Sequence, residues 1–241
     1  MEAGAEIMDA LSAQSLLGWW QDAGVDMFVD EAPRNWLAEP RAPAVASAEI
    51  PQSAPAPVTP RTMPAFRAWL EEAEALPDGS PKGRRIFPSG DVSSALMVLV
   101  DMPEPGDSDA GALLSDDAGR LFDRMLAAIG RSRDSIWLAS LTLTRPAGGG
   151  IDAQCAEAIG AFAKHHVALV RPRRLLLMGQ AASRAVLGMD LVAARGSLHA
   201  VNHDGVNMEA VATFAPRFLL RNPQRKADSW RDLRLLIEGI E

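Results

Sequence analysis

The sequence has a single cysteine, Cys155, and no apolar run long enough to cross a bilayer. One cysteine excludes an intramolecular disulfide and any metal site built on several thiolates. No window approaches the ~18 uninterrupted apolar residues of a membrane-spanning helix. The N-terminal segment MEAGAEIMDA is acidic and lacks the basic stretch of a secretory signal. We therefore expect a cytoplasmic protein that does not enter a membrane.

A global excess of positive charge is also missing, because the net charge is −7. Residues 1–60 hold nine Asp or Glu and two Arg, which leaves 22 basic and 22 acidic residues in 61–241. From Arg171 onward, eleven Lys or Arg stand against seven Asp or Glu. The charge pattern excludes a broad basic footprint but leaves room for a local phosphate-facing patch in the last third of the chain.

The first 60 residues differ in composition from the rest. Residues 12–30, SAQSLLGWWQDAGVDMFVD, show apolar residues at helical spacing behind an N-cap-type serine. The segment 40–64 holds seven of the 17 prolines and few large apolar residues, which is typical of an extended linker. We predict an acidic helical extension over 1–39, a Pro/Ala-rich linker over 40–62, and a folded domain over 63–241.

Strand-like and helix-like segments alternate through this domain. Buried-type strands are predicted at 94–102, 135–143 and 173–179, and two shorter strands at about 197–201 and 208–214. Helices are predicted at 63–76, 115–130, 151–170, 180–188 and 224–239. This alternation predicts a three-layer α/β/α domain with a central, mainly parallel sheet.

Ligands of such sheets bind beyond the carboxyl ends of the strands. Four segments are predicted to meet at that edge: DMPEPGD (101–107), TRPAGGG (144–150), MGQAA (178–182) and TFAPRFLLRNP (213–223). The last of these continues into 226 with four positive charges and no negative one, and it reads as a loop suited to a polyanion.

These rim motifs resemble those of the uracil-DNA glycosylase superfamily, in particular the bacterial iron–sulfur branch known as family four. The resemblance rests on AGRLFDRMLAAIGRSRDSIWLAS (118–140), the cysteine-bearing helix and strand of 155–188, RGSLH (195–199) and PRFLLRNPQRKADSWRDL (216–233). It implies the fold of that family and, as activity, the flipping of a uracil out of DNA followed by cleavage of its N-glycosidic bond.

The resemblance also implies that the pocket chemistry has changed at four positions. Met102 replaces an acidic residue that activates water, and Leu114 replaces a phenylalanine that stacks on the base. Ser140 replaces an asparagine that reads the uracil edge, and Ala215 replaces a histidine that stabilises the departing base. Loss of one acid–base group costs about 10²–10⁴-fold and loss of one such hydrogen-bond donor about 10²–10³-fold. Ordinary uracil excision is therefore not expected.

Two nearby carboxylates, Glu104 and Asp107, are the candidates for substitute acid–base groups. If one of them activates water, the chain is a divergent but active glycosylase for uracil or another deaminated base.

The family's four-iron cluster needs about four protein ligands. Thr144 takes the place of one ligand cysteine, the N-terminal pair has no counterpart, and Cys155 alone remains. We therefore predict no iron–sulfur cluster and no other metal. Cys155 itself is expected to be a small buried residue of its helix.

The DNA-contacting frame around the pocket is retained. Arg217, Arg221 and Lys226 are expected to contact the phosphate backbone. Leu219 and Leu220 match an apolar pair that enters the minor groove in the family. The structural alternative makes both leucines core residues that end a strand, with Arg221 as a helix-cap charge.

Three functions remain open at this point. The first is a catalytically degenerate member of this superfamily that binds DNA or a DNA-repair partner. The second is the divergent active glycosylase. The third is a protein–protein module in which the tryptophan-containing helix of 12–30 recruits another factor.

Overall fold

The computed structural model describes residues 60–152 and 154–238. The predicted helix at 12–30 lies outside these residues, as do the extension 1–39 and all but the last three residues of the linker 40–62. Within the described residues, no helix has the length and apolarity that crossing a bilayer requires.

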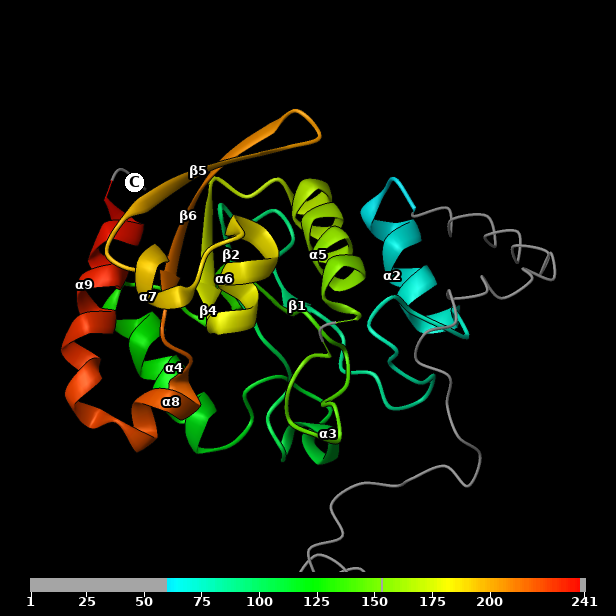
Figure 1. The fold of residues 1–241 in the computed structure, drawn as a ribbon, viewed down its shortest axis with the longest axis horizontal. Coiled ribbons are helices and arrows are strands. Elements are labelled where there is room, and N and C mark those ends of the chain that lie inside the picture. The colour runs from blue at the N-terminus through cyan, green and yellow to red at the C-terminus, as the bar shows by residue number, and fades with distance from the viewer. Residues whose placement is uncertain (1–59, 153, 239–241) are drawn as a thin grey trace, which may run out of the picture. The chain divides into compact units, whose positions relative to one another are not determined.

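The strands of this region form one mixed sheet in the order β1-β3-β2-β4-β6-β5 (Figure 1). They are β1 (Ser89–Gly90), β2 (Leu96–Val100), β3 (Trp137–Ser140), β4 (Arg174–Met178), β5 (Leu198–His203) and β6 (Val206–Thr213). The four central strands run parallel, whereas β1 and β5 pair antiparallel at the two edges. The predicted mainly parallel sheet is thereby confirmed.

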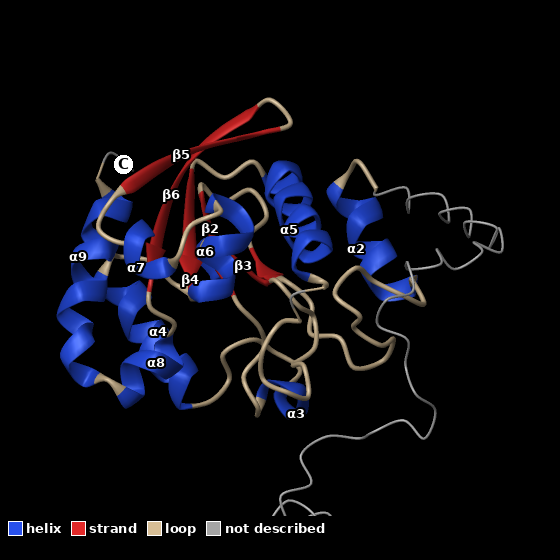
Figure 2. Ribbon diagram, viewed as in Figure 1, coloured by secondary structure: helices blue, strands red, loops and turns tan. Residues whose placement is uncertain are grey.

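Helices cover both faces of the sheet (Figure 2). They are α2 (Met63–Glu72), α3 (Asp107–Ala110), α4 (Asp117–Ala128), α5 (Ala156–Val170), α6 (Gln180–Leu187), α7 (Leu191–Ala194), α8 (Pro216–Arg221) and α9 (Lys226–Ile237). Short 3₁₀ turns, η1 (Arg133–Ser135) and η2 (Pro223–Arg225), precede β3 and α9. The order of layers is the α/β/α arrangement that the sequence predicts.

Alternate residues of the central strands belong to different hydrophobic clusters. Met97 and Leu99 of β2 pack with α5 and α6, whereas Val98 and Val100 pack with α4 and α9. All five residues of β2 are buried. The nearly continuous apolar run of this strand therefore follows from its burial on both faces.

Several predicted elements are shorter than expected, and two of them border the site. The strand of 135–143 ends at Ser140, because Leu143 then bonds to the preceding segment: its N–H donates to Asp78 Oδ2 at 2.6 Å and its carbonyl accepts from Ile86 N at 2.7 Å. The helix predicted at 151–170 begins only at Ala156.

The last two strands form a hairpin. Asp204 and Gly205 connect them with positive φ angles of 49° and 73°, the conformation of a type I′ turn. β6 has eight residues, so it is longer than predicted, and it pairs parallel with β4 on the side opposite β2.

The basic segment that follows β6 is helical rather than a loop, which corrects the sequence-based expectation. α8 begins at Pro216, whose fixed φ suits the first helical position, behind the extended Ala215. Leu219 of α8 is buried in the core while Leu220 is exposed. The short helix thus has one face in the protein and one in solvent.

His166 joins α5 to the sheet through a buried hydrogen bond. The indole N–H of Trp137 in β3 donates to His166 Nε2 at 3.0 Å, and the Phe66 ring of α2 stacks on the imidazole with centroids 4.8 Å apart. Burial, with a smaller contribution from His165, lowers the pKa of His166 to about 3. The histidine is therefore neutral in the folded protein.

We expect protonation of His166 to oppose folding. An unfolded histidine titrates near pH 6.5, so between about pH 6.5 and 3 the unfolded chain binds a proton that the folded chain does not. The stability that depends on neutral His166 is present above this window and is lost as the pH falls through it. His166→Gln retains an acceptor for Trp137 but cannot titrate. Urea unfolding across the window should show the pH slope flattened by up to about 1.4 kcal/mol per pH unit.

His203→Gln is the matched control, because His203 lies at the hairpin with a third of its side chain exposed. It should keep the wild-type slope. A His166→Gln protein with an unchanged slope would show that His166 is not buried neutral.

Candidate functional site

The carboxyl ends of the parallel strands border a cavity of about 450 Å³. All four predicted rim segments contribute to its wall, through Asp101 and Met102, Gly149 and Gly150, Gln180 and Ala181, and Arg217. The apolar side chains of Leu141, Ile151 and Ile159 line the rest. The structure therefore confirms that these segments, far apart in the chain, meet at one edge of the sheet.

Asp101 is the first residue after β2 and is 8% exposed. Its Oδ1 accepts a hydrogen bond from Ala182 N at 2.8 Å, in the first turn of α6. Burial raises the pKa of Asp101, although the backbone donors of α6 and the charge of Arg217 oppose the rise. Gly179, with φ of 126°, passes so close that a Cβ there would lie 2.2 Å from Asp101 Oδ2. Only glycine leaves room for this carboxylate.

Arg217 of α8 lies between two buried carboxylates. Its guanidinium is 3.9 Å from Asp101 Oδ2 and 3.6 Å from Glu104 Oε1, and 28% of its side chain is exposed. Both distances exceed hydrogen-bond length, so the contacts are ion pairs without a fixed hydrogen bond. The residue expected to contact DNA phosphates is thus turned toward the cavity.

Glu104, one of the two predicted substitute carboxylates, is 5% exposed. Burial raises the pKa of Glu104, while Arg217 and Arg145 act in the opposite direction. Arg145 also donates to Pro103 O at 2.9 Å and holds the loop in place. Glu104 therefore has the environment of a group that can exchange a proton nearer neutral pH than a free carboxyl.

Asp107, the other predicted substitute, is fully buried and holds the loop together. Its Oδ2 accepts from Glu104 N and Leu114 N, each at 2.8 Å. Its Oδ1 accepts from the backbone N and the hydroxyl of Ser115 at 2.8 and 2.7 Å. With four donors on its oxygens, Asp107 is a structural carboxylate, and the geometry does not favour it as a base.

Leu114 fills the position predicted to stack on a base, but it is 2% exposed and has a positive φ of 55°. Arg133 holds this turn by donating to the carbonyls of Leu113 and Leu114 at 2.7 and 2.6 Å. A Cβ on Gly119 of α4 would lie 1.7 Å from Leu114 O, so glycine is required there. The turn is rigid, and its leucine faces the interior.

Ser140 and Ala215 complete the four replaced positions. The Ser140 hydroxyl donates to Thr142 O at 2.8 Å and is buried, so it is already engaged within its own loop. Ala215 precedes α8 and has no side-chain donor. Met102 is 5% exposed at the cavity wall. None of these three side chains presents a free hydrogen-bonding group to a ligand.

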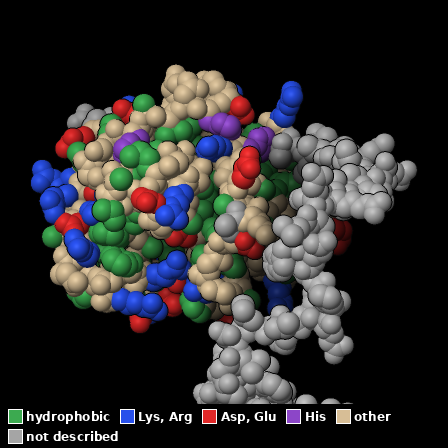
Figure 3. Space-filling view, viewed as in Figure 1, with side chains coloured by type: hydrophobic (Ala, Val, Ile, Leu, Met, Phe, Trp, Pro, Cys, Tyr) green, Lys and Arg blue, Asp and Glu red, His purple; other side chains and the backbone are tan. Residues whose placement is uncertain are grey.

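The outer face of α8 and the start of α9 carry the remaining predicted contact residues. Arg221, Lys226 and Leu220 are exposed, the last at 41%. Leu219 is 1% exposed and packs in the core, so it does not project toward solvent. Figure 3 shows Lys and Arg side chains gathered along the lower and left margin of the molecule, over α8 and α9.

Sequence reasoning missed Asp101 as a site residue and the inward direction of Arg217. One signal for Asp101 was present, because a carboxylate directly after a buried parallel strand lies at the ligand-binding edge. No signal in the sequence shows that Arg217 bridges two carboxylates of another segment.

The described residues do not fit an iron–sulfur cluster. No group of three or more His, Cys, Asp or Glu side chains in the described ranges is placed to hold a metal ion. Cys155 precedes α5 and is exposed, which corrects the expectation that it is buried; the helix begins one residue after it. Thr144, at the position of a second ligand, hydrogen-bonds to Ser80. The absence of a cluster nevertheless stays a prediction.

A hydrogen-bonded cluster of Asp78, Ser80 and Arg85 ties the segment after α2 to the loop after β3. The Ser80 hydroxyl lies 3.0 Å from Thr144 Oγ1 and accepts from Thr144 N at 3.0 Å, and it also bonds to Asp78. Buried Arg85 donates to Leu70 O at 2.8 Å and to Ser80 O at 2.9 Å. These polar bonds, together with the packing of Leu76 and Leu143 in one hydrophobic cluster, fasten this segment beside the site.

We expect Asp78→Ala to destabilise the domain. The substitution removes the acceptors of Leu143 N, Ser80 N and the Ser80 hydroxyl. Loss of a charged acceptor from part-buried donors should lower the free energy of unfolding by roughly 2–3 kcal/mol, measured by urea denaturation. Glu157→Ala, an exposed carboxylate on α5, is the control and should change it little. Equal stability of the two variants would refute a fastening role.

Comparison with known proteins finds similarity over most of the described domain. Residues 87–234 match the family model described as the uracil DNA glycosylase superfamily. A type-4 uracil-DNA glycosylase of Pyrobaculum aerophilum is 21% identical over 157 residues, which cover 62% of this chain and 80% of that protein. The match to the family model includes β2 to β6, the cavity at the carboxyl ends of the parallel strands, and α8.

Proposed function

Because this chain belongs to the uracil DNA glycosylase superfamily, we propose that it is a DNA-binding member that has lost ordinary uracil excision. It would act by binding DNA or a DNA-repair partner.

The state of the replaced side chains carries this proposal. Excision needs a group that activates water, a reader of the base edge and a donor to the departing base. Ser140 is engaged with its own loop, Ala215 has no donor, and Asp107 already accepts four hydrogen bonds. A pocket without buried polar readers discriminates poorly between bases. These observations support the proposal that the fold of the pocket is retained without the groups that excise uracil.

The DNA half of the proposal is supported by the exposed residues of α8 and α9. Arg221 and Lys226 offer two cations on one face, and Leu220 offers an exposed apolar side chain beside them. Cations of this kind neutralise phosphates, and an apolar wedge can enter a widened minor groove. Leu219 is excluded from that role by its burial.

One observation favours a second function, a divergent active glycosylase. Glu104 has a raised pKa and faces the guanidinium of Arg217 beside the cavity. A carboxyl with such a pKa suits general acid–base work, and a cation stabilises negative charge that develops on a departing base. In this function Glu104 activates the water that cleaves the N-glycosidic bond of a deaminated base. The third hypothesis, partner capture by residues 12–30, lies outside the described residues and stays a prediction.

A panel of duplexes that carry uracil, hypoxanthine or xanthine distinguishes a DNA-binding protein without excision activity from a divergent active glycosylase. We expect no abasic product on any of them, because Met102, Ser140 and Ala215 present no free hydrogen-bonding side chain to the pocket. The measurement is strand cleavage at abasic sites after alkali. Product that disappears in Glu104→Gln would overturn the proposal and establish the divergent glycosylase.

The same panel is run with the triple variant Met102→Glu, Ser140→Asn and Ala215→His. Regained cleavage of uracil would show that these positions correspond to the family's catalytic ones. The unfolding free energy of the triple variant is measured alongside, so that loss of folding is distinguished from lack of rescue.

We expect the protein to bind short duplex DNA with little sequence preference and strong salt dependence. Replacing Arg221 and Lys226 together by Gln should reduce the slope of log K against log salt by about 1 for each lost phosphate contact. Fluorescence anisotropy titrations at several salt concentrations measure this slope. The control is Arg67→Gln with Arg84→Gln, two exposed arginines whose replacement removes the same charge. No wild-type binding at low salt would remove the DNA half of the proposal.

A further inference from the structure

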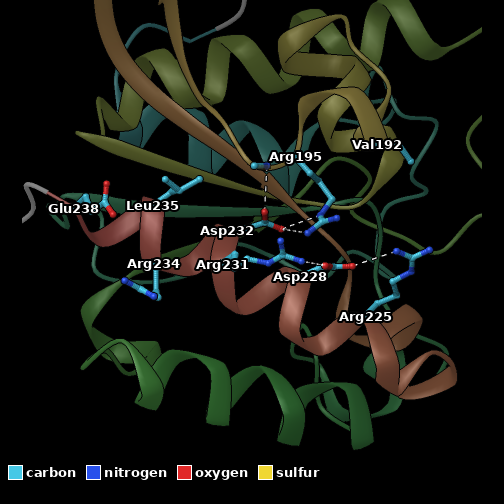
Figure 4. Close-up of a pocket in the computed structure, with 10 residues that line it drawn as sticks. Val192, Arg195, Arg225, Asp228, Arg231, Asp232, Arg234, Leu235 and Glu238 are labelled. Atoms are coloured by element: carbon cyan, nitrogen blue, oxygen red, sulfur yellow. Dashed lines mark hydrogen bonds and ion pairs between the residues drawn. The ribbon is translucent and has the colours of Figure 1, made fainter.

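A groove of about 530 Å³ lies between α7 and α9 and shares no lining residue with the cavity at the strand ends (Figure 4). Its charged lining residues are four arginines and three carboxylates: Arg195, Arg225, Arg231, Arg234, Asp228, Asp232 and Glu238.

Asp232 and Arg195 form the buried wall of the groove. Arg195 Nη2 lies 2.8 Å from Asp232 Oδ2, and Asp232 also accepts from Thr213 Oγ1 at 2.8 Å. The Arg195 guanidinium stands 4.1 Å from the centroid of the Phe214 ring. With Asp232 1% exposed, its charge is neutralised inside the protein and is not offered to a ligand.

Asp228 holds two guanidiniums at the mouth of the groove. Arg225 Nη1 lies 3.2 Å from Asp228 Oδ2, and Arg231 Nη2 contacts Asp228 Oδ1. The hydrogen bond from Arg225 and the charges of neighbouring arginines keep the pKa of Asp228 below its usual value. One carboxylate against two guanidiniums leaves one positive charge, with both arginines more than half exposed.

Arg234 adds a further cation along the same helix. Among the described residues it has no ion pair or hydrogen-bond partner through its side chain, and it is exposed. Figure 4 shows Arg225, Arg231 and Arg234 following one another along α9. The stretch 216–234 holds six Lys or Arg against two Asp, a local charge of +4 in a chain of net charge −7.

We propose that this groove binds the sugar–phosphate backbone of a nucleic-acid strand, as a continuation of the DNA-contacting surface of α8. The inference rests on the proposed DNA binding. A guanidinium fork matches two phosphate oxygens, and the ion pairs with Asp228 hold two such forks ready in place. From Arg225 to Arg234 the helix rises about 14 Å. Phosphates of one strand follow one another about every 3.4 Å along a duplex axis, so this span faces about four of them.

The lining favours a phosphate chain over an acidic protein helix. A docked amphipathic helix buries a continuous apolar stripe, whereas the groove offers only Val192 and Leu235 as apolar side chains. Arg225 is the last residue of η2 and directly precedes Lys226, so the groove continues the α8 surface without a break.

The test is an anisotropy titration of a labelled duplex against the full-length protein and the double variant Arg231→Gln, Arg234→Gln. Both side chains are exposed, and the buried pair of Arg195 and Asp232 is left intact. We expect the salt slope to fall by about 2 and low-salt affinity to fall roughly tenfold. Urea unfolding of the variant should match wild type, which confirms that the fold is kept. The double variant Arg67→Gln, Arg84→Gln again serves as the control, because both arginines are exposed and neither lines the groove. Arg67 belongs to α2, which lies on the opposite side of the domain from α9 in Figure 1.

Each outcome decides between named explanations. Wild-type DNA binding with an unchanged slope in the α9 variant would overturn this inference alone. Absence of wild-type binding at low salt would overturn both it and the proposed DNA binding. Polyglutamate and unlabelled DNA of equal charge are compared as competitors of the labelled duplex. If polyglutamate displaces the duplex as effectively as the DNA does, the occupant of the groove is an acidic polypeptide, and this inference is overturned.

Discussion

The carboxylate of Asp101 is buried at the point where β2, α6 and α8 come together, and the arrangement of the site depends on it. An ionised carboxyl in this position costs free energy unless donors and an opposite charge surround it. The first turn of α6 supplies backbone N–H groups, Gly179 removes the Cβ that would collide with it, and Arg217 supplies the charge. Arg217 is thereby drawn inward and also approaches Glu104. The cavity, the direction of α8 and the outward face left to Leu220 and Arg221 all follow from satisfying this one buried group.

A second set of polar contacts holds the loops around the pocket in place. Asp107 gathers the backbone of the loop after β2, Arg133 fixes the turn at Leu114, and Asp78 with Ser80 fastens the segment after α2. Each of these polar groups is saturated by backbone partners, which makes them good structural elements and poor acid–base catalysts. A frame held in this way suits the proposed binding role. The surface along α8 and α9 carries six Lys or Arg against two Asp over residues 216–234, a local charge of +4 in a chain of net charge −7.

Most of the fold was predictable because the driving patterns are local. Apolar runs such as LMVLV in β2 indicate strands buried on both faces. Asp116 accepts from Ala118 N and is of the residue type that favours the start of a helix. The short elements α3, α7 and α8 were not predicted, since helices of four to six residues carry too little periodicity to be recognised. Cys155 was assigned to the interior for a related reason: the start of α5 was placed too early, and one shifted boundary moves a residue from a buried helix face to an exposed cap.

By itself, the sequence determined the α/β/α architecture, the edge of the sheet where a ligand would bind, and the identities of the side chains at the predicted pocket positions. Tertiary structure alone decided which of those side chains are free. Contacts between segments far apart in the chain decide whether Asp107 is a base or a structural carboxylate, and whether Arg217 faces DNA or two carboxylates. Such contacts also decide which of Leu219 and Leu220 is exposed to solvent. Periodicity and motif spacing describe the neighbours of a residue along the chain. Burial and hydrogen-bond saturation depend on neighbours in space, and no local pattern encodes them.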